Sequence, residues 1–240
     1  SGFCLWTYGS ISPMRALTLL QQRISECTLC PRLTTYRQGI AREKVKRFRE
    51  WEYWGRPVPG FGDGQARLFV VGLAPAAHGG NRTGRVFTGD RSGDWLYEAL
   101  HAFDFANQPT SVHKEDGLLL NRCYVAAAVR CAPPANKPTK EEFETCRAYL
   151  EEELRLLKNV NVVVALGKIA FDEYLRTCQV MGFDRVAPRP KFSHGAEFRL
   201  PWGGTLLGSY HPSQQNTFTG TLTRPMFHQI FRRARALIKQ

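Results

Sequence analysis

Four short, mostly apolar segments alternate with longer amphipathic stretches, and this alternation limits the possible fold more than any other feature. The segments are rich in Val, Leu and Ala and lie at 68–72, 124–130, 160–166 and 205–210. Short apolar runs of this kind are typical of strands buried on both faces of a sheet. Strands that alternate with helices predict a parallel sheet with helices on both sides, so we expect one three-layer α/β/α domain over 1–240 with four central strands.

Local signals place the helices between these strands. Ser12 can cap a helix that has Pro13 in its first position, and Thr139 with Glu142 forms a capping box that begins another. Further helices are expected from about Gly93 to Phe105, after Gly167, and from about Thr223. The basic, aromatic stretch that follows the first cysteine pair ends in several Pro and Gly residues, so we expect a loop there.

Polar loops follow three of the predicted strands. They lie at 72–90, 131–138 and 209–220, and they are rich in Gly, Asn, Gln and Ser. In open α/β sheets, ligands bind at the carboxyl ends of the strands. The three loops are therefore expected to converge on one site.

The chain is strongly basic, and the positive charge is segregated. The 240 residues carry a formal net charge of +12, and Lys and Arg gather at 32–56 and 224–239 while acidic residues gather at 141–153. General solubility would explain the charge alone, but its segregation indicates a polyanion such as nucleic acid. No apolar stretch is long enough for a membrane span and no secretory leader is seen, so no membrane contact and a cytoplasmic location are expected.

Seven cysteines are present, and four have the pattern of a metal centre. Cys27 and Cys30 form C-x-x-C, Cys131 ends a predicted strand, and Cys146 lies in the next helix. Four thiolates suit either zinc or a [4Fe-4S] cluster. The 14 residues between the second pair favour the cluster, because structural zinc sites usually use two tight pairs. The other cysteines are expected to be core residues: Cys4, Cys123 and Cys178.

Several motifs together resemble the uracil-DNA glycosylase superfamily, and within it family 5, the B-type enzymes. They are C-x-x-C at 27–30, WGRPVPGFGDG at 54–64, GLAPAAHGGNRTGRVFTGD at 72–90, VRCAPPANKPT at 129–139, Cys146, and YHPSQQNTFTGTLTR at 210–224. They span nearly the whole chain in the family's order. The resemblance implies a uracil-DNA glycosylase-like fold, a structural [4Fe-4S] cluster, a monomer, and excision of deaminated bases from DNA in base excision repair.

Three positions depart from the uracil-specific members of that superfamily. The resemblance places Ala74 where those enzymes carry a water-positioning Asp, and Ala76 where they carry a Tyr that blocks larger bases. Ala127 aligns with an Asn that reads the uracil edge. A roomier pocket is therefore expected, with uracil and also hypoxanthine or xanthine as substrates.

Asp90 and Asn136 are the candidates for stabilising the sugar cation and holding the attacking water. Asp90 is the only carboxylate between Gly72 and Arg91, although it could instead cap the helix that follows. Asn136 could instead be an ordinary turn residue. No lysine lies in the loops at 72–90 and 209–220, so a monofunctional glycosylase that leaves an abasic site is expected.

His211 matches the family's second-motif histidine and is expected to donate a hydrogen bond to the departing base, although a lone histidine is often structural. Phe87 is expected to stack on the flipped base, and a core phenylalanine is the alternative. The remaining base-binding candidates are Gly72, Leu73, Ala74 and His78. The candidates for DNA contacts are Asn81, Arg82, Arg85, Ser213, Gln214, Gln215 and Asn216.

Two rival interpretations remain open. A hydrolase or nucleotide-binding enzyme of another class is disfavoured, because no G-x-S-x-G motif and no P-loop are present. A non-catalytic iron–sulfur or zinc protein that binds nucleic acid would fit the charge and the cysteines. It would not explain why uncharged polar residues gather after three strands.

Overall fold

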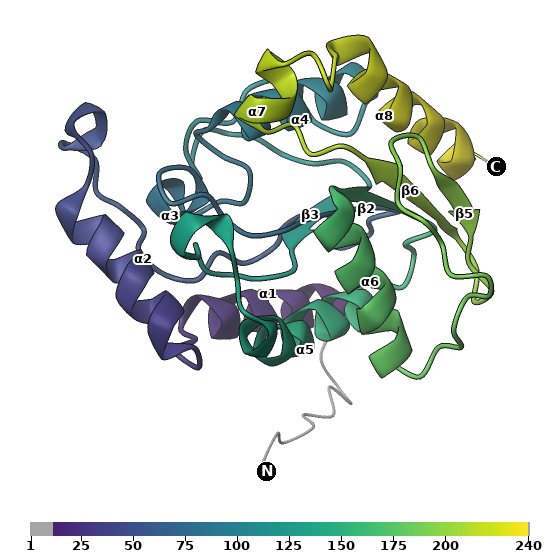
Figure 1. The fold of residues 1–240 in the computed structure, drawn as a ribbon, viewed down its shortest axis with the longest axis horizontal. Helices are drawn as coiled ribbons and strands as arrows, with labels where there is room; N and C mark the ends of the chain where they lie inside the picture. Colours follow the sequence, from purple (N-terminus) through teal and green to yellow (C-terminus); the bar gives the residue numbers. More distant parts are fainter. Residues whose placement is uncertain (1–11, 240) are drawn as a thin grey trace.

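The computed structural model describes residues 12–239, which form a six-stranded sheet between two layers of helices (Figure 1). The strand order is β1-β3-β2-β4-β6-β5. Its four central strands run parallel: β3 (Cys123–Ala127), β2 (Leu68–Gly72), β4 (Val162–Leu166) and β6 (Thr205–Ser209). Every residue of these four strands is buried, which confirms the parallel core predicted from the apolar segments.

Two edge strands make the sheet mixed, so the predicted count of four strands was wrong. β1 (Phe61–Gly62) pairs antiparallel with β3, and β5 (Glu197–Arg199) pairs antiparallel with β6. β1 has only two residues, and β5 exposes both of its charged ends. Neither segment has an apolar run of its own. Both segments become strands because their backbones pair with β3 and β6. The local sequence does not show this pairing.

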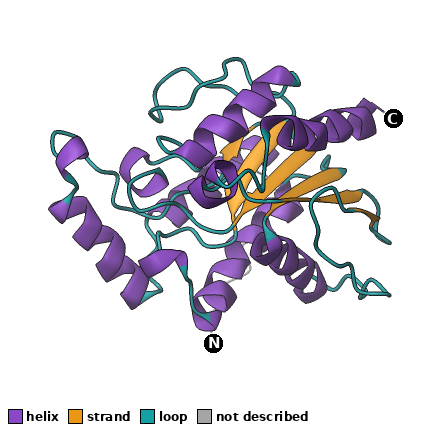
Figure 2. Ribbon diagram, turned by 45° about the horizontal axis from the view of Figure 1, so that its top comes forward, coloured by secondary structure: helices purple, strands orange, loops and turns teal. Residues whose placement is uncertain are grey.

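The two faces of the sheet bury different side chains, as expected for the alternation along a strand. One face packs on α4 (Arg91–Ala102) and α8 (Arg224–Lys239), and the other packs on α1 (Pro13–Ser25), α5 (Lys140–Leu156) and α6 (Lys168–Val180) (Figures 1 and 2). In β2, Leu68 and Val70 belong to the first apolar cluster, and Phe69 and Val71 belong to the second. This is the predicted α/β/α arrangement.

The helix starts follow the capping signals in the sequence. The Ser12 hydroxyl accepts a hydrogen bond from the Arg15 amide, and Pro13 opens α1. The capping box of α5 is complete: Glu142 N–H donates to the Thr139 hydroxyl, and the Thr139 amide donates to the Glu142 carboxylate at 2.8 Å. Local side-chain chemistry thus sets both helix boundaries.

α2 (Pro31–Glu43) is a helix where a loop was predicted, and η1 (Lys46–Phe48) follows it. Only Leu33 and Arg37 of α2 are buried, so the helix has no apolar stripe that periodicity could detect. The Arg37 guanidinium packs inward and donates to the carbonyls of Gly55 and Cys27. A polar anchor replaces the usual apolar face.

Three short helices lie in the polar loops that follow parallel strands. They are α3 (Gly80–Thr83), η2 (Pro134–Asn136) and α7 (Gln214–Phe218). Within residues 12–239, no helix combines the length and the apolar composition that crossing a membrane would require. Cys4, expected as a core residue, lies outside the described residues.

Candidate active site

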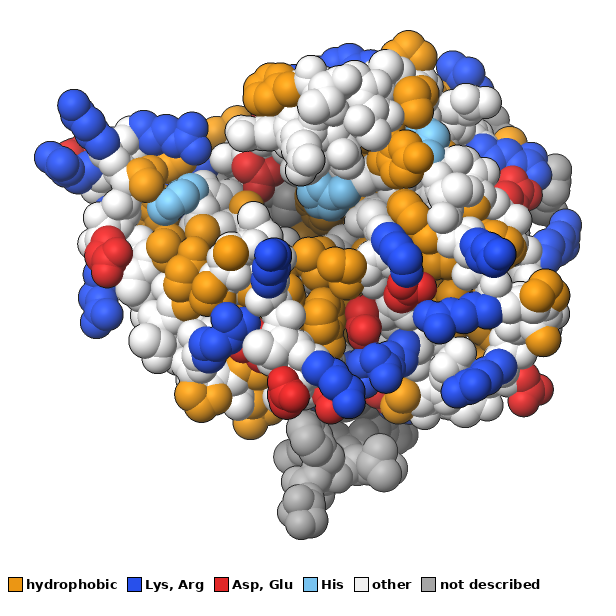
Figure 3. All heavy atoms as spheres, viewed as in Figure 1, with side chains coloured by type: hydrophobic (Ala, Val, Ile, Leu, Met, Phe, Trp, Pro, Cys, Tyr) orange, Lys and Arg blue, Asp and Glu red, His pale blue; other side chains and the backbone are white. Residues whose placement is uncertain are grey.

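Two of the three loops that were predicted to converge, those after β2 and β6, meet at the carboxyl edge of the sheet. The rings of Phe87 and His211 lie 5.9 Å apart between centroids, and the Arg91 Nε donates to the Thr217 hydroxyl at 2.8 Å. The space-filling view shows this face hollowed below the lobe that carries α7, with a histidine side chain at the hollow (Figure 3). The contact of Arg91 was not predicted, although its place next to Asp90 in the sequence was a usable signal.

Phe87 forms an aromatic wall against the end of β2. Its ring lies directly on Gly72, where a Cβ would collide with the Phe87 ring carbons. Phe87 also has φ 51°, a left-handed backbone that is strained for a bulky residue and costs about 1–3 kcal/mol. Strain of this kind marks functional sites more often than core positions. The side chain is buried, so Phe87 serves both the core and the wall of the site.

His211 lies just past β6 and is kept neutral by its surroundings. Burial lowers the pKa of His211 to about 4, with no charged group among the causes. Its backbone carbonyl accepts a hydrogen bond from the Asn216 side-chain amide at 2.8 Å, which fixes the loop around it. A neutral imidazole has one N–H donor and one acceptor nitrogen, so His211 can donate a hydrogen bond without a charge.

Asp90 is the N-cap of α4, which confirms the helix-capping role given above as the alternative to catalysis. Its Oδ1 accepts from the Gly93 amide at 2.9 Å. Its Oδ2 instead faces Gly79 in the loop after β2 (residues 72–90, called the first loop below), where a Cβ on Gly79 would collide with it. Burial raises the pKa of Asp90, and the Gly93 amide partly offsets this. One oxygen therefore caps the helix, and the other faces Gly79 in the loop after β2.

Among the described residues, no hydrogen bond joins the Asn136 side chain to Asp90 or His211. It lies in the exposed η2 turn, and both Ala135 and Asn136 have a left-handed backbone, with φ 52° and 56°. Asn tolerates this conformation well. β3 runs parallel to β2, so the loop that carries η2 does leave from the same edge of the sheet. The catalytic role of Asn136 stays a prediction.

The remaining base-binding candidates line the first loop at different depths. The carbonyls of Gly72 and Leu73 accept from the amides of Ala128 and Val129, which extends the β2–β3 pairing to Leu73. Ala74 and His78 are half-buried. The His78 Nδ1 lies 3.0 Å from the Tyr53 hydroxyl, and burial with nearby Arg47 lowers the pKa of His78. His78 is thus held by Tyr53 and lies apart from the pairing of Phe87 with His211.

Three predicted DNA-contact residues are internal instead, and the reason is burial. Asn81, Arg82 and Arg85 are each 3% exposed or less. The Arg85 guanidinium pairs with Asp116 at 2.7 Å, and the Asn81 side-chain amide donates to the Arg37 carbonyl. The Arg82 guanidinium donates to the backbone carbonyls of His78 and Gly89. A guanidinium or amide group can bind DNA only when it is exposed to solvent. The local sequence does not show which of these side chains are exposed.

The loop after β6 divides into inward and outward side chains. Ser213 caps α7 by accepting from the Asn216 amide, and Asn216 binds the His211 carbonyl. These two side chains position the loop. Gln214 and Gln215 are exposed, and Phe218 is 69% exposed beyond them. The outward residues are available for the DNA contacts that the sequence predicted.

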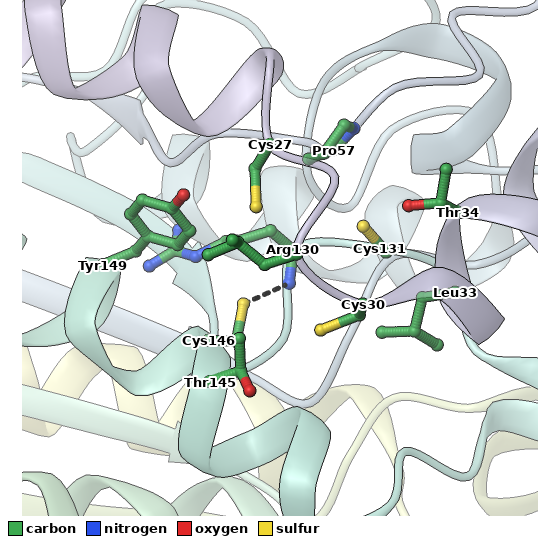
Figure 4. Close-up of a pocket in the computed structure, with 11 residues that line it drawn as sticks. Cys27, Cys30, Leu33, Thr34, Pro57, Arg130, Cys131, Thr145, Cys146 and Tyr149 are labelled. Carbon is green, nitrogen blue, oxygen red and sulfur yellow. Dashed lines mark hydrogen bonds between the residues drawn. The ribbon is translucent and has the colours of Figure 1, made fainter. Parts of the chain in front are cut away.

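The four predicted cysteine ligands line one small pocket (Figure 4). Cys27 and Cys30 come from the α1–α2 junction, Cys131 from the loop after β3, and Cys146 from α5. Their side chains lie around a shared space, and the Arg130 amide donates to the Cys146 sulfur at 3.3 Å. All four are free thiols, while Cys123 and Cys178 belong to the two core clusters as predicted.

The chemistry of this pocket suits a positively charged group. Burial raises the pKa of Cys131 and of Cys146 to about 12 each, so both thiols stay protonated unless a cation offsets the buried charge. Within residues 12–239, no three His, Cys, Asp or Glu side chains form a group that could hold a metal ion.

Comparison with known proteins agrees with the resemblance seen in the sequence. The family model described as the Uracil DNA glycosylase superfamily matches residues 59–235. A type-5 uracil-DNA glycosylase of Mycobacterium bovis is 50% identical over 230 residues, which cover 95% of this chain and 82% of that protein. A type-5 enzyme of Thermus thermophilus is 50% identical over 216 residues, which cover 90% of this chain and 95% of that protein.

Similarity to the type-4 branch is lower. A type-4 uracil-DNA glycosylase of Thermotoga maritima is 25% identical over 227 residues, which cover 93% of this chain and 95% of that protein. The matched segment includes both loops that form the candidate site, and the type-5 similarity extends over the cysteine positions as well. The chain belongs to the uracil-DNA glycosylase superfamily, and its similarity places it with the type-5 members.

Proposed function

We propose that this chain hydrolyses the bond between uracil and deoxyribose in DNA, as the first step of base excision repair. The observation that carries the proposal is the pairing of Phe87, from the loop after β2, with His211, from the loop after β6. In the loop after β2, the Oδ2 of Asp90 also faces Gly79. A base inside a duplex is out of reach of such a pocket, so the target nucleotide is flipped out of the stack. The family to which the chain belongs and the names of its type-5 relatives support the same reaction.

His211 and Phe87 act on the base. The flipped uracil stacks on the Phe87 ring, and the neutral His211 imidazole donates a hydrogen bond to the oxygen that gains charge as the bond breaks. A donor fixed in advance for a developing anion contributes about 2.7–4 kcal/mol. Asn216 holds the His211 backbone and so limits the movement of this donor.

Asp90 acts on the sugar and the water. Its Oδ2 faces Gly79 rather than the Gly93 amide, and a carboxylate in that position stabilises the oxocarbenium-like sugar and orients the attacking water. We assign the water to Asp90 rather than Asn136, because Asn136 is exposed in a separate turn. The loops after β2 and β6 contain no lysine, so the reaction stops at an abasic site. The protein acts as a monomer in this proposal.

The substrate range extends beyond uracil. Ala74 and Ala76 are half-buried and carry only a methyl group where larger side chains would narrow the pocket. The Ala76 Cβ lies close to Gly79 and so faces the same space as Asp90. Hypoxanthine and xanthine, which are larger than uracil, are therefore proposed as further substrates.

The four-cysteine pocket holds a [4Fe-4S] cluster in this proposal, with Cys27, Cys30, Cys131 and Cys146 as ligands. The cluster supplies a covalent cross-link between segments that are distant in sequence, and no redox step in the reaction is needed. Its ligands join the α1–α2 junction to the loop after β3 and to α5. A protein isolated without air should show broad visible absorbance, whereas a colourless protein with one bound zinc would overturn this assignment.

One assay tests the reaction directly. A duplex with a single uracil is incubated with the protein and then treated with alkali, which cleaves the strand only where the base has been lost. Strand cleavage by wild type, and its loss in Asp90→Asn, is the expected result. If the wild type binds the duplex but never yields alkali-sensitive sites, the chain is the non-catalytic nucleic-acid-binding protein considered above.

A further inference from the structure

A basic arm protrudes at one end of the molecule, next to the first catalytic loop. We define this arm as residues 42–49, the end of α2 with η1, which lies beside α3 in Figure 1. Its exposed cations are Arg42, Lys46, Arg47 and Arg49. The space-filling view shows Lys and Arg side chains gathered at this end of the molecule (Figure 3). The proposed mechanism uses none of these residues.

The charges of the basic arm are not neutralised by neighbours. Among the described residues, no ion pair joins an arm cation to an acidic side chain. The second basic stretch of the sequence behaves differently. In α8, Arg224 pairs with Glu98 and Arg233 pairs with Glu197, so much of its charge is already balanced. The two segments look alike in sequence, but the arm keeps more of its charge unpaired.

Arg82 fastens the arm to the catalytic loop. Its guanidinium carbon lies 3.7 Å from the Phe48 ring centroid and 4.1 Å from that of Trp51. The same guanidinium donates to the carbonyls of His78 and Gly89, each at 2.8 Å. Gly89 directly precedes Asp90 in the chain. One buried cation therefore fixes the arm relative to the loop that carries the candidate catalytic carboxylate.

Further hydrogen bonds make this junction rigid. The amides of Trp54 and Gly55 donate to the carbonyls of Arg82 and Asn81 at 2.9 and 3.0 Å. The Tyr53 hydroxyl forms a hydrogen bond with the Nδ1 of His78. These contacts tie the chain that follows the arm, and the Asn81 side-chain amide, which donates to the Arg37 carbonyl, ties the chain that precedes it. A polyanion that binds the arm is held at a fixed position relative to the active site.

We propose that the basic arm binds the phosphate backbone of the DNA duplex that flanks the damaged nucleotide. This inference rests on the proposed function for the location of the lesion, but not for the binding itself. The arm has exposed Lys and Arg side chains with no acidic partner among the described residues, and it is held next to the loop after β2. Phosphate contacts fix the register of a protein on a duplex without reading its sequence.

Salt dependence of binding gives the test. Lys46→Ala/Arg49→Ala removes two arm charges that contact no aromatic ring. Arg232→Ala/Arg233→Ala removes the same charge from α8 and is the matched control. Binding to an undamaged duplex is measured over a range of salt concentrations. The slope of log K against log salt is negative, and each lost phosphate contact reduces its magnitude by about 0.9. The magnitude of the slope should therefore be about 1.8 smaller for the arm variant than for wild type.

The outcomes separate this inference from the proposed reaction. A reduced slope for the arm variant and an unchanged slope for the α8 variant would support the arm. Equal slopes for wild type and arm variant, or the same reduction in both variants, would overturn it. The measurement needs no base excision, so it stands even if the glycosylase assay fails. Single-turnover excision at saturating DNA should be the same for the arm variant and wild type, because the arm does not touch the reacting atoms.

Discussion

Replacing Asp90 by Asn separates the two roles that the structure gives this side chain. Asn caps helices about as well as Asp, so the hydrogen bond from Gly93 can be kept. The substitution removes only the negative charge that faces Gly79 and the first loop. We expect Asp90→Asn to fold with nearly wild-type stability and to excise uracil far more slowly.

The size of the effect follows from the charge. A carboxylate about 4 Å from a sugar cation contributes roughly 4 kcal/mol at an effective dielectric constant of about 20. Loss of that energy lowers the rate about 10³-fold. Asp90→Ala should show a similar rate loss together with a stability loss of about 1 kcal/mol, because it also removes the cap. The pair of variants thus separates catalysis from capping.

Single-turnover excision of uracil and urea unfolding are the two measurements. The wild-type rate should also fall at low pH, since Asp90 acts as a carboxylate. Burial raises the pKa of Asp90, so this acid decline should lie above the pH at which an exposed Asp is protonated. A rate for Asp90→Asn within a few-fold of wild type would refute the electrostatic role, and Asp90 would then be only a helix cap.

Further predictions concern the core, the pocket and the cysteines. Arg85→Met should destabilise the fold by about 3–5 kcal/mol in urea unfolding, since it strands the partly buried Asp116, and DNA affinity of the folded protein should not change. Although burial acts against it, hydrogen bonds from Arg85 and backbone amides lower the pKa of Asp116 to about 2, so the stability from this pair should be present above about pH 4 and be lost as the pH falls toward 2. Ala76→Tyr should keep uracil excision and abolish hypoxanthine release, and persistent hypoxanthine release would contradict the roomy pocket. Cys146→Ser should remove the visible absorbance and lower the melting temperature, and an unchanged spectrum would exclude Cys146 as a ligand.

Local patterns in the sequence were sufficient for the frame of this protein. The apolar segments identified the four parallel strands, and the caps at Ser12 and Thr139 identified helix starts, because strand burial and capping depend on residues close together in the chain. The motifs also placed Phe87 and His211 in one site. The helix α2 was missed, since it is anchored by Arg37 rather than by an apolar stripe.

Only the tertiary structure decided which polar side chains are available for function. Asn81, Arg82 and Arg85 have the composition of a DNA-binding loop but are buried by contacts with α2, the basic arm and Asp116. Likewise, within residues 12–239 the two basic stretches differ, because acidic partners from distant segments pair with α8 and none pairs with the arm. The sequence determines which charges exist, whereas long-range packing determines which are desolvated, paired or left facing solvent.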